Sequence, residues 1–325
     1  MSTTNGTVAV RVRSATWLAD RVMGLDLVSL DGTPLPLWEA GAHIDLILPS
    51  GKIRQYSLHG SHEDRRVYQV AVLLEADGRG GSKEVHETAL VGREIAIRGP
   101  RNHFALVDAA DYRFVAGGIG ITPILSMIRQ VAGQGRRWSL MYGGRSRGSM
   151  AFLDELQKIP GGDVTVVPQD EAGLLDLAAL HAGATPETAF YCCGPEGLLR
   201  ALTATLEAVG RADSLHVERF SAPPAPAPAG TAGGHVNTEF TVELAASGIS
   251  VTVPPDRSVL EVVSEVAPTV LSSCAEGYCG TCETRVISGI PDHRDTLLTP
   301  ADKATNETMM ICVSRCLGSK LVLDL

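Results

Sequence analysis

Four cysteines in the last fifth of the sequence have the spacing of a metal site. Cys274, Cys279 and Cys282 follow a C-x4-C-x2-C pattern, and Cys312 comes after 29 further residues. Plant-type [2Fe–2S] clusters use this spacing, with four thiolates holding two irons. A structural zinc site usually pairs its ligands as C-x2-C…C-x2-C, and unrelated buried thiols need no pattern. We therefore predict a [2Fe–2S] cluster with these four cysteines as its ligands.

Gly277 and Gly280 lie between these cysteines and support the prediction. A backbone wrapped closely around sulfide needs residues that accept a positive φ, and its N–H groups must approach sulfur without a Cβ in the way. Such a cluster moves single electrons and makes no bonds. The rest of the chain is therefore expected to contain an electron source.

One candidate source lies in the first third of the chain. The residues are Arg54, Gln55, Tyr56 and Ser57 on an expected strand, then Gly80, Gly81 and Ser82 before an expected helix. Arginine, tyrosine and serine offer the cation, the flat ring and the hydroxyl that a flavin requires. Glycines ahead of a helix leave N–H groups that can bind an anion. Each stretch alone can also be an ordinary half-buried strand or a flexible turn.

A second candidate source lies in the middle of the chain, where loops follow expected strands. Its residues are Gly117, Gly118, Gly120 and Thr122 in one loop and Cys193, Gly194 and Pro195 in a later one. The first loop is not the G-x-G-x-x-G fingerprint, but it leads into an expected helix at Pro123–Val131, with Thr122 able to cap it. Doubly wound folds bind nucleotides at such an edge. Either loop alone can be a structural turn, whereas together they predict a dinucleotide site.

The order of expected elements divides the chain into four parts. Residues 1–105 contain six short strands and predict an antiparallel flavin-binding barrel. Alternating strands and helices at 106–220 predict a doubly wound parallel sheet that binds the nucleotide. An Ala- and Pro-rich linker occupies 221–235. Residues 236–325 combine a hairpin, a helix opened by a Ser258–Glu261 capping box and the cysteine loop, so the whole is multidomain, α+β and α/β, ending in a β-grasp ferredoxin domain.

Composition restricts the partners of the chain. Its 325 residues carry a net charge of −9, which disfavours nucleic acid, and no apolar run reaches membrane-spanning length. The N-terminus has no secretory pattern, and seven cysteines with metal spacing favour a reducing compartment. We expect a cytoplasmic monomer that binds neither membrane nor nucleic acid.

Negative charge is concentrated at the end of the chain. Residues 236–325 contain six Lys and Arg against twelve Asp and Glu, whereas residues 1–105 contain twelve of each. Complementary charge speeds the association of proteins. We therefore expect a basic surface on the partner that accepts electrons, the alternative being that the acids only keep a small domain solvated.

Several motifs in sequence order carry a family resemblance. They are RQYSLHG, GRGGS, GGIGITPILSM, YCCGPEGLL, the cysteine pattern and PDHRD at Pro291–Asp295. Through them the chain resembles the phthalate dioxygenase reductase family, which includes vanillate demethylase reductases, over nearly its whole length. The resemblance implies that NADH, FMN and a C-terminal [2Fe–2S] domain pass electrons to a Rieske oxygenase. FMN in place of FAD rests on the resemblance alone.

The resemblance also implies roles for individual residues. FMN would be held by Arg54, Tyr56, Ser57, Gly80, Gly81 and Ser82, and Gln55 is a further cofactor-binding candidate. Flavin and nicotinamide would meet at Gly118, Gly120 and Thr122, beside the further cofactor-binding candidate Gly117. Cys193, Gly194 and Pro195 would close over the nicotinamide, with Phe220 nearby. Cys192 and Cys316 have no ligand role and are expected to be buried thiols.

The choice of nucleotide is less direct. Arg145 and Arg147 follow an expected sheet strand, where cations can bind a 2′-phosphate and favour NADPH. Exposed arginines are also common in loops, and the resemblance implies NADH. We predict NADH, with Arg145 in the cofactor site.

Together these parts predict an electron-transfer enzyme without a catalytic acid or base. NADH gives up two electrons at once and a cluster accepts one at a time, so a flavin must connect them. The predicted function is the reductase component of a two-component Rieske non-haem iron oxygenase. The alternatives are a reductase for another one-electron acceptor such as a cytochrome P450, a stand-alone diaphorase, and a non-enzymatic zinc or redox-sensing module that lacks flavin.

Overall fold

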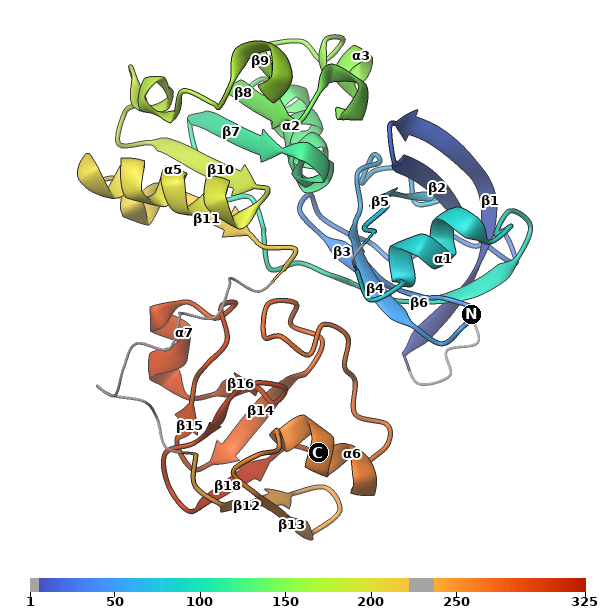
Figure 1. Ribbon diagram of the computed structural model, residues 1–325, viewed down its shortest axis with the longest axis vertical. Helices are drawn as coiled ribbons and strands as arrows, with labels where there is room; N and C mark the ends of the chain where they lie inside the picture. Colours follow the sequence, from blue (N-terminus) through green and yellow to red (C-terminus); the bar gives the residue numbers. More distant parts are fainter. Residues whose placement is uncertain (1–5, 77, 222–236) are drawn as a thin grey trace. The chain divides into compact units, whose positions relative to one another are not determined.

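The computed structural model describes residues 6–76, 78–221 and 237–325 (Figure 1). The chain divides into two compact units, Met1–Arg219 and Phe220–Leu325. The predicted linker at 221–235 lies outside the described residues, apart from Ser221. Within the described ranges, no helix is both long and apolar enough to cross a membrane.

Residues 7–101 form the predicted antiparallel barrel. The strands are β1 (Thr7–Ala19), β2 (Val22–Ser29), β3 (His43–Ile47), β4 (Ile53–Ser57), β5 (Tyr68–Leu73) and β6 (Glu94–Arg101), in the order β4-β3-β6-β1-β2-β5. A bridge between Leu58 and Val70 joins the two edges of this sheet. Alternate residues such as Val8 and Val10 face the core, as the two-residue period of a strand requires. Helix α1 (Gly81–Glu87) packs onto the same core through Val85.

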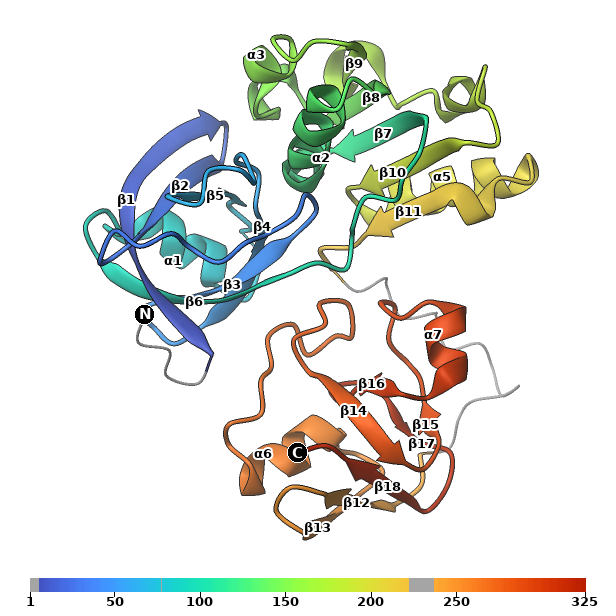
Figure 2. The same ribbon diagram turned by 180° about the vertical axis from the view of Figure 1, so that it is seen from behind.

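Residues 111–218 form the predicted doubly wound parallel sheet. Its strands are β7 (Asp111–Gly117), β8 (Arg137–Gly144), β9 (Gly162–Pro168), β10 (Thr188–Cys193) and β11 (Leu215–Glu218), in the order β11-β10-β7-β8-β9. Helix α2 (Ile121–Gly133) covers one face and helix α5 (Glu196–Ala208) covers the other (Figures 1 and 2). The shorter elements are η1 (Gly118–Gly120), η2 (Arg147–Ser149), α3 (Leu153–Leu156), α4 (Gln169–Ala172), η3 (Leu177–His181) and η4 (Ala212–Ser214). Since the strands are parallel, the loops after β7, β8, β9 and β10 meet at one edge of the sheet.

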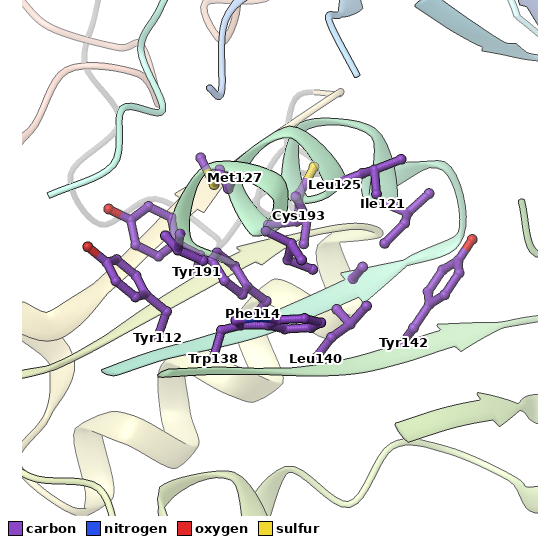
Figure 3. Packing of buried hydrophobic residues seen from close by; sticks show 14 of the residues in the cluster. Tyr112, Phe114, Ile121, Leu125, Met127, Trp138, Leu140, Tyr142, Tyr191 and Cys193 are labelled. Carbon is purple, nitrogen blue, oxygen red and sulfur yellow. The ribbon is translucent and has the colours of Figure 1, made fainter. Parts of the chain in front are cut away.

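Two neighbouring cysteines show that this sheet is buried on both faces. Cys193 lies with Phe114 and Tyr191 in the core beneath α2 (Figure 3). Cys192 lies in the separate core beneath α5. Successive strand residues point to opposite faces, so a strand covered by helices on both sides is apolar throughout. Cys192 is thus a buried free thiol, as predicted.

The second unit contains a five-stranded sheet of the predicted β-grasp type. The strands β12 (Phe240–Leu244), β13 (Ile249–Val253), β14 (Glu283–Ser288), β16 (Thr308–Met310) and β18 (Lys320–Leu323) lie in the order β13-β12-β18-β14-β16, and β15 (Pro291–Asp292) pairs with β17 (Arg315–Cys316). The helices are α6 (Val259–Val266) and α7 (Pro300–Thr305). The predicted capping box opens α6: Glu261 N–H donates to Ser258 Oγ at 3.2 Å, and Ser258 N–H donates to Glu261 Oε2 at 2.7 Å.

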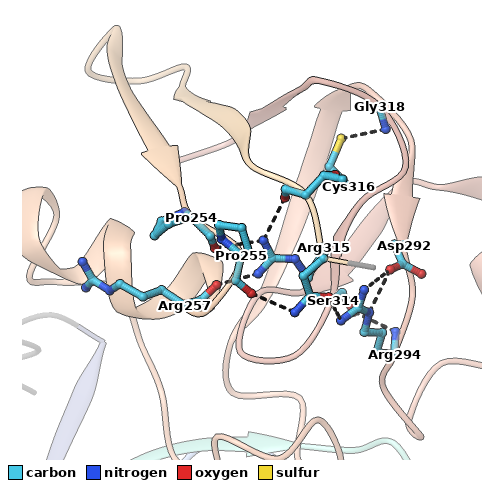
Figure 4. Close-up of polar contacts among 11 residues, drawn as sticks. Pro254, Pro255, Arg257, Asp292, Arg294, Ser314, Arg315, Cys316 and Gly318 are labelled. Carbon is cyan, nitrogen blue, oxygen red and sulfur yellow. Dashed lines mark hydrogen bonds and ion pairs between the residues drawn. The ribbon is translucent and has the colours of Figure 1, made fainter. Parts of the chain in front are cut away.

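A buried arginine ties separate segments of this unit together (Figure 4). Arg315 donates to the carbonyl oxygens of Arg257 at 2.6 Å, Pro254 at 3.0 Å and Thr238 at 3.1 Å. Its guanidinium carbon also lies 5.1 Å from the centroid of the Phe240 ring. A buried cation is tolerated only when its N–H groups are bonded, and the carbonyls supply these bonds. The network therefore restrains the chain just after the last patterned cysteine.

Candidate functional site

The structure gathers the four patterned cysteines in one buried place. Cys274, Cys279, Cys282 and Cys312 are all buried, and their thiols hydrogen-bond one another, Cys274 with Cys279 and Cys312, and Cys282 with Cys312. Hydrogen bonding with Cys279 and then Cys312 lowers the pKa of Cys274, whereas the same contacts raise the pKa of Cys279 and of Cys312. A metal would replace these shared protons, because thiols bind metal as thiolates. Among the described residues, no group of three or more His, Cys, Asp or Glu side chains is placed to hold a single metal ion. The four thiols therefore fit a two-iron cluster, which divides its ligands between two metals, and not a mononuclear site.

The loop between the cysteines has the backbone that a cluster requires. Gly277 and Gly280 have φ angles of +74° and +75°, as predicted. Ala275 also has a positive φ, +56°, which the sequence does not indicate. The N–H of Glu276 donates to Cys274 Sγ at 3.3 Å. N–H groups directed at sulfur stabilise thiolate charge, so the donor set fits a [2Fe–2S] cluster.

The buried Asp295 packs against the cysteine loop at Gly277. Asp295 accepts the N–H of Leu298 at 2.8 Å and lies 3.6 Å from Lys303 Nζ. Its Cα is 3.2 Å from the position that a Cβ would take on Gly277, and Thr296 N–H donates to Gly277 O at 3.1 Å. Asp295 can approach this closely because residue 277 is glycine. The PDHRD motif contains Asp295, but its residue pattern gave no sign of this contact.

In the first unit, β4 meets the loop before α1. A Cβ on Gly81 would lie 2.5 Å from Arg54 Nε, so glycine is what lets the arginine cross this loop. Arg54 Nη2 donates to Arg79 O at 2.8 Å. Gly80 precedes α1 with a φ of +78°. A cation held beside the backbone N–H groups of a glycine-rich loop is a suitable environment for a phosphate.

Ser57 gives a separate indication that a polar ligand binds beside β4. It is 4% exposed, and no described residue partners its hydroxyl. A buried hydroxyl without a partner costs free energy, and a hydrogen bond to the edge of a flavin ring could offset this cost.

The other predicted flavin contacts differ in their surroundings. Burial raises the pKa of Tyr56, so its phenol stays neutral. Gln55 lies on the opposite strand face from Tyr56. The hydroxyl of Ser82 is engaged, because it accepts the N–H of Glu75 at 3.0 Å.

The loops after β7 and β10 touch through their backbones. A Cβ on Gly120 would lie 2.2 Å from Cys193 O and 2.8 Å from Gly194 N. A Cβ on Gly117 would lie 2.7 Å from Pro195 Cδ. Glycine at both positions therefore allows the start of α2 to press against the end of β10. Both loops lie at the carboxyl edge of the sheet, where nucleotides bind in doubly wound folds.

The start of α2 differs from the sequence prediction. The sequence predicts a helix at Pro123–Val131 capped by Thr122, whereas the helix spans Ile121–Gly133. Thr122 is buried within the first turn, and its hydroxyl donates to Ile119 O at 3.0 Å. The 3-10 turn at Gly118–Gly120 runs directly into the helix, so no side chain caps it.

Two further predicted cofactor contacts lie at the ends of strands. Arg145 is exposed just after β8, and its carbonyl accepts the N–H of Asp170 at 3.2 Å. Phe220 is 39% exposed and is the first residue of the second unit. The contact of Phe220 with the nicotinamide therefore stays a prediction.

Glu218, on β11, is a candidate that the sequence analysis missed. Its Oε2 lies 4.0 Å from Cys193 Sγ, directly across the pairing of β10 with β11. Burial raises the pKa of Glu218 to about 8. Burial and then Glu218 raise the pKa of the Cys193 thiol well above its usual range. This end of the sheet therefore presents a neutral thiol and a largely protonated carboxyl group at neutral pH.

We predict that Glu218 makes folding stability depend on pH. Its folded pKa of about 8 exceeds its ordinary value of 4.5, so the folded chain holds a proton that the unfolded chain releases. The stability that Glu218 contributes should then fall as pH rises from about 5 to about 8, by up to about 1.4 kcal/mol per pH unit. Burial lowers the pKa of His43 and of His59, so these two groups give the opposite slope below about pH 6.5. Glu218→Gln should remove this contribution of Glu218 and so change the slope of stability against pH, and the exposed Glu207→Gln should keep the wild-type slope, in urea unfolding across that range. Equal slopes for wild type and Glu218→Gln would show that the carboxyl is not the cause.

The sequence matches two domain families. Residues 242–317 match the 2Fe-2S iron-sulfur cluster binding domain, and residues 114–204 match the oxidoreductase NAD-binding domain. The first match contains all four patterned cysteines. The second contains both loops that touch at the carboxyl edge of the parallel sheet.

Relatives match almost the whole chain. Phenoxybenzoate dioxygenase subunit beta from Ectopseudomonas oleovorans is 42% identical over 98% of this chain and 97% of its own length. A solved structure of phthalate dioxygenase reductase is 35% identical, with a TM-score of 0.70, over 99% of this chain and 100% of that one. An intact type IV self-sufficient cytochrome P450 monooxygenase is 43% identical over 98% of this chain, with a TM-score of 0.87, and this chain spans only 41% of that protein. As its motifs predict, the chain belongs to the phthalate dioxygenase reductase family of oxidoreductases.

Proposed function

We propose that this protein is the reductase component of a two-component Rieske oxygenase, carrying electrons from NADH through FMN and a [2Fe–2S] cluster. The observation that carries the proposal is the gathering of four buried thiols around a loop with positive φ angles. The match to phthalate dioxygenase reductase and to a dioxygenase subunit over nearly the whole chain supports it. A bound flavin would supply the step from a two-electron donor to a one-electron acceptor.

The residues in this proposal position redox groups and transfer no proton. Arg54 and the loop before α1 would bind the FMN phosphate, and Ser57 would bond the edge of its ring. Gly117 and Gly120 would bring the nucleotide loops together, because each leaves room for the neighbouring backbone. Enclosing these groups in fixed positions is itself the catalytic contribution of the protein.

Reconstitution tests this function. The purified protein would be combined with NADH and, in turn, with each Rieske oxygenase of the same organism, and consumption of an aromatic substrate would be scored. We expect one oxygenase to turn over only when this reductase is present. If the reductase reduces cytochrome c but none of the oxygenases, the Rieske assignment is wrong.

One observation favours a second acceptor class, a cytochrome P450. A segment 43% identical to this chain forms 41% of an intact self-sufficient P450 monooxygenase. The same reconstitution with P450 proteins of the organism distinguishes the two classes. Faster reduction of a P450 than of any Rieske oxygenase would favour the second candidate.

We also propose that the protein is a cytoplasmic monomer that prefers NADH. The thiols of the cluster require reducing surroundings, which supports the location. Sedimentation of the purified protein tests the oligomeric state. Values of kcat/KM for both nucleotides test the preference, and a tenfold advantage of NADPH, about 1.4 kcal/mol, would overturn it.

We predict that electron transfer to the oxygenase slows with salt. The acidic surplus of residues 236–325 would steer a basic partner, and screening shortens the range of that steering from about 30 Å at 0.01 M salt to about 8 Å at 0.15 M. Reduction of the flavin by NADH should change little over the same range. Stopped-flow kinetics of both steps provides the comparison, and an equal response of the two steps would rule out electrostatic docking.

A further inference from the structure

The loops that follow β8 and β9 are joined by an ion pair at the nucleotide edge of the sheet. Arg147 Nη2 donates to Glu171 Oε2 at 2.9 Å, and Arg147 Nε lies 3.3 Å from Oε1. The two strands are parallel neighbours, with Gly144 opposite Pro168 at their ends. Both oxygens of one carboxylate therefore face one guanidinium, the geometry of a bidentate pair.

Two more carboxylates lie around the same loop. Hydrogen bonding to Glu171, and then the charges of Glu171 and Asp170, raise the pKa of Arg147. On another side, Asp20 N–H donates to Gly148 O at 2.8 Å, and a Cβ on Gly148 would lie 2.7 Å from Asp20 Oδ2. The positive charge of Arg147 is thus offset by Glu171 and Asp170.

This edge is where doubly wound folds distinguish the two nicotinamide nucleotides. A carboxylate near the strand ends can bond the ribose 2′-hydroxyl of NADH, or an arginine can bind the 2′-phosphate of NADPH. If Arg147 were unpaired, it would attract a phosphate that carries up to about two negative charges. In the wild type, the Arg147 guanidinium is paired with Glu171 and is not available to a phosphate. The negative charge of Glu171 also repels a phosphate at this position.

We propose that Glu171 is a specificity-determining residue that excludes nucleotides carrying a ribose 2′-phosphate. The inference rests on the proposed NADH-dependent function and names the group that sets its preference. The side chains of Arg147 and Glu171 are 56% and 50% exposed. Exposed ion pairs contribute little to folding, so Glu171 can be replaced without unfolding the chain.

Steady-state kinetics of three variants tests the assignment. In Glu171→Gln, kcat/KM for NADPH should rise at least tenfold while kcat/KM for NADH stays within about twofold. The double variant Arg147→Gln/Glu171→Gln should lose this gain, because the guanidinium that Glu171 had paired is gone, and Arg145 is present in every variant and in the wild type. Glu187→Gln is the matched control, since Glu187 is exposed in the loop before β10, at the opposite edge of the sheet. An unchanged NADPH-to-NADH ratio in Glu171→Gln, or an equal gain in the control, would overturn the assignment.

A binding measurement separates this inference from the proposed function. Calorimetry with 2′,5′-ADP and 5′-ADP needs no electron acceptor and no turnover. Glu171→Gln should tighten 2′,5′-ADP at least tenfold and leave 5′-ADP within about twofold of the wild type. If the wild type fails to oxidise NADH but calorimetry gives this result, the proposed function fails and the role of Glu171 stands. If 2′,5′-ADP is not tightened, the role of Glu171 is wrong whatever the activity.

Discussion

Cys279→Ser should abolish electron transfer beyond the flavin and leave reduction of the flavin by NADH intact. Cys279 is buried and shares hydrogen bonds with Cys274, so its sulfur lies within the set of thiols. Serine is a much poorer iron ligand than thiolate, and a four-thiolate site that loses one ligand loses its irons. We expect the iron content to fall to background. The rate of cytochrome c reduction should fall at least roughly tenfold, which corresponds to an increase of about 1.4 kcal/mol in the activation free energy.

Cys316→Ser is the matched control for this prediction. Cys316 is also buried in the second unit, but it lies outside the ligand pattern. Its sulfur accepts the N–H of Gly318 at 3.2 Å, a bond that a serine oxygen can replace. This variant should keep both its irons and its cytochrome c activity. A Cys279→Ser protein with two irons and full activity would refute the ligand assignment.

Gly120→Ala should stop NADH from reducing the flavin. The new Cβ would lie 2.2 Å from Cys193 O and 2.5 Å from Cys193 C, both of which are backbone atoms and cannot rotate away. The loops after β7 and β10 must therefore separate, at a cost of about 1–3 kcal/mol in folding stability. A displacement of about 1 Å at the nucleotide can lower the rate roughly 100-fold. Stopped-flow reduction of the flavin by NADH measures this loss.

Gly133→Ala tests whether the effect belongs to this contact. Gly133 is the last residue of α2, and no heavy atom lies within 4 Å of the position its Cβ would take. Alanine favours a helix over glycine by up to about 1 kcal/mol, so this variant should be at least as stable as wild type and equally active. Iron content should be normal in both variants. A Gly120→Ala protein that is reduced by NADH within about twofold of wild type would contradict the role given to this contact.

Elements with a strong local pattern could be predicted from the sequence. The six strands of residues 1–105 and the capping box of Ser258 with Glu261 are present as expected. Strand β11 was missed because its four residues, Leu215–Glu218, are all partly buried and show no alternation. Strand β14 was missed because it follows the cysteine loop directly, although Thr284 and Val286 alternate with exposed residues.

Some parts of the candidate site could likewise be predicted from local sequence, and others depend on the folded chain. Cysteine spacing predicts the cluster because all four ligands are the same residue type and lie at fixed intervals in the sequence. The crossing of Arg54 over Gly81 depends on strands and a helix that meet only in the folded chain. Glu218 comes to lie by Cys193 through the register of β10 and β11, and no spacing in the sequence encodes that register. The positive φ of Ala275 has no signal, because alanine rarely adopts it.

In the proposed mechanism, electrons from NADH reach the cluster only through the flavin. Anaerobic reduction by NADH, followed by low-temperature EPR of the reduced [2Fe–2S] cluster, tests it in native protein, in protein stripped of flavin, and after FMN is restored. We expect a full cluster signal in the native protein, none without flavin, and recovery of the signal with FMN. A cluster signal of equal size in the protein stripped of flavin would contradict it.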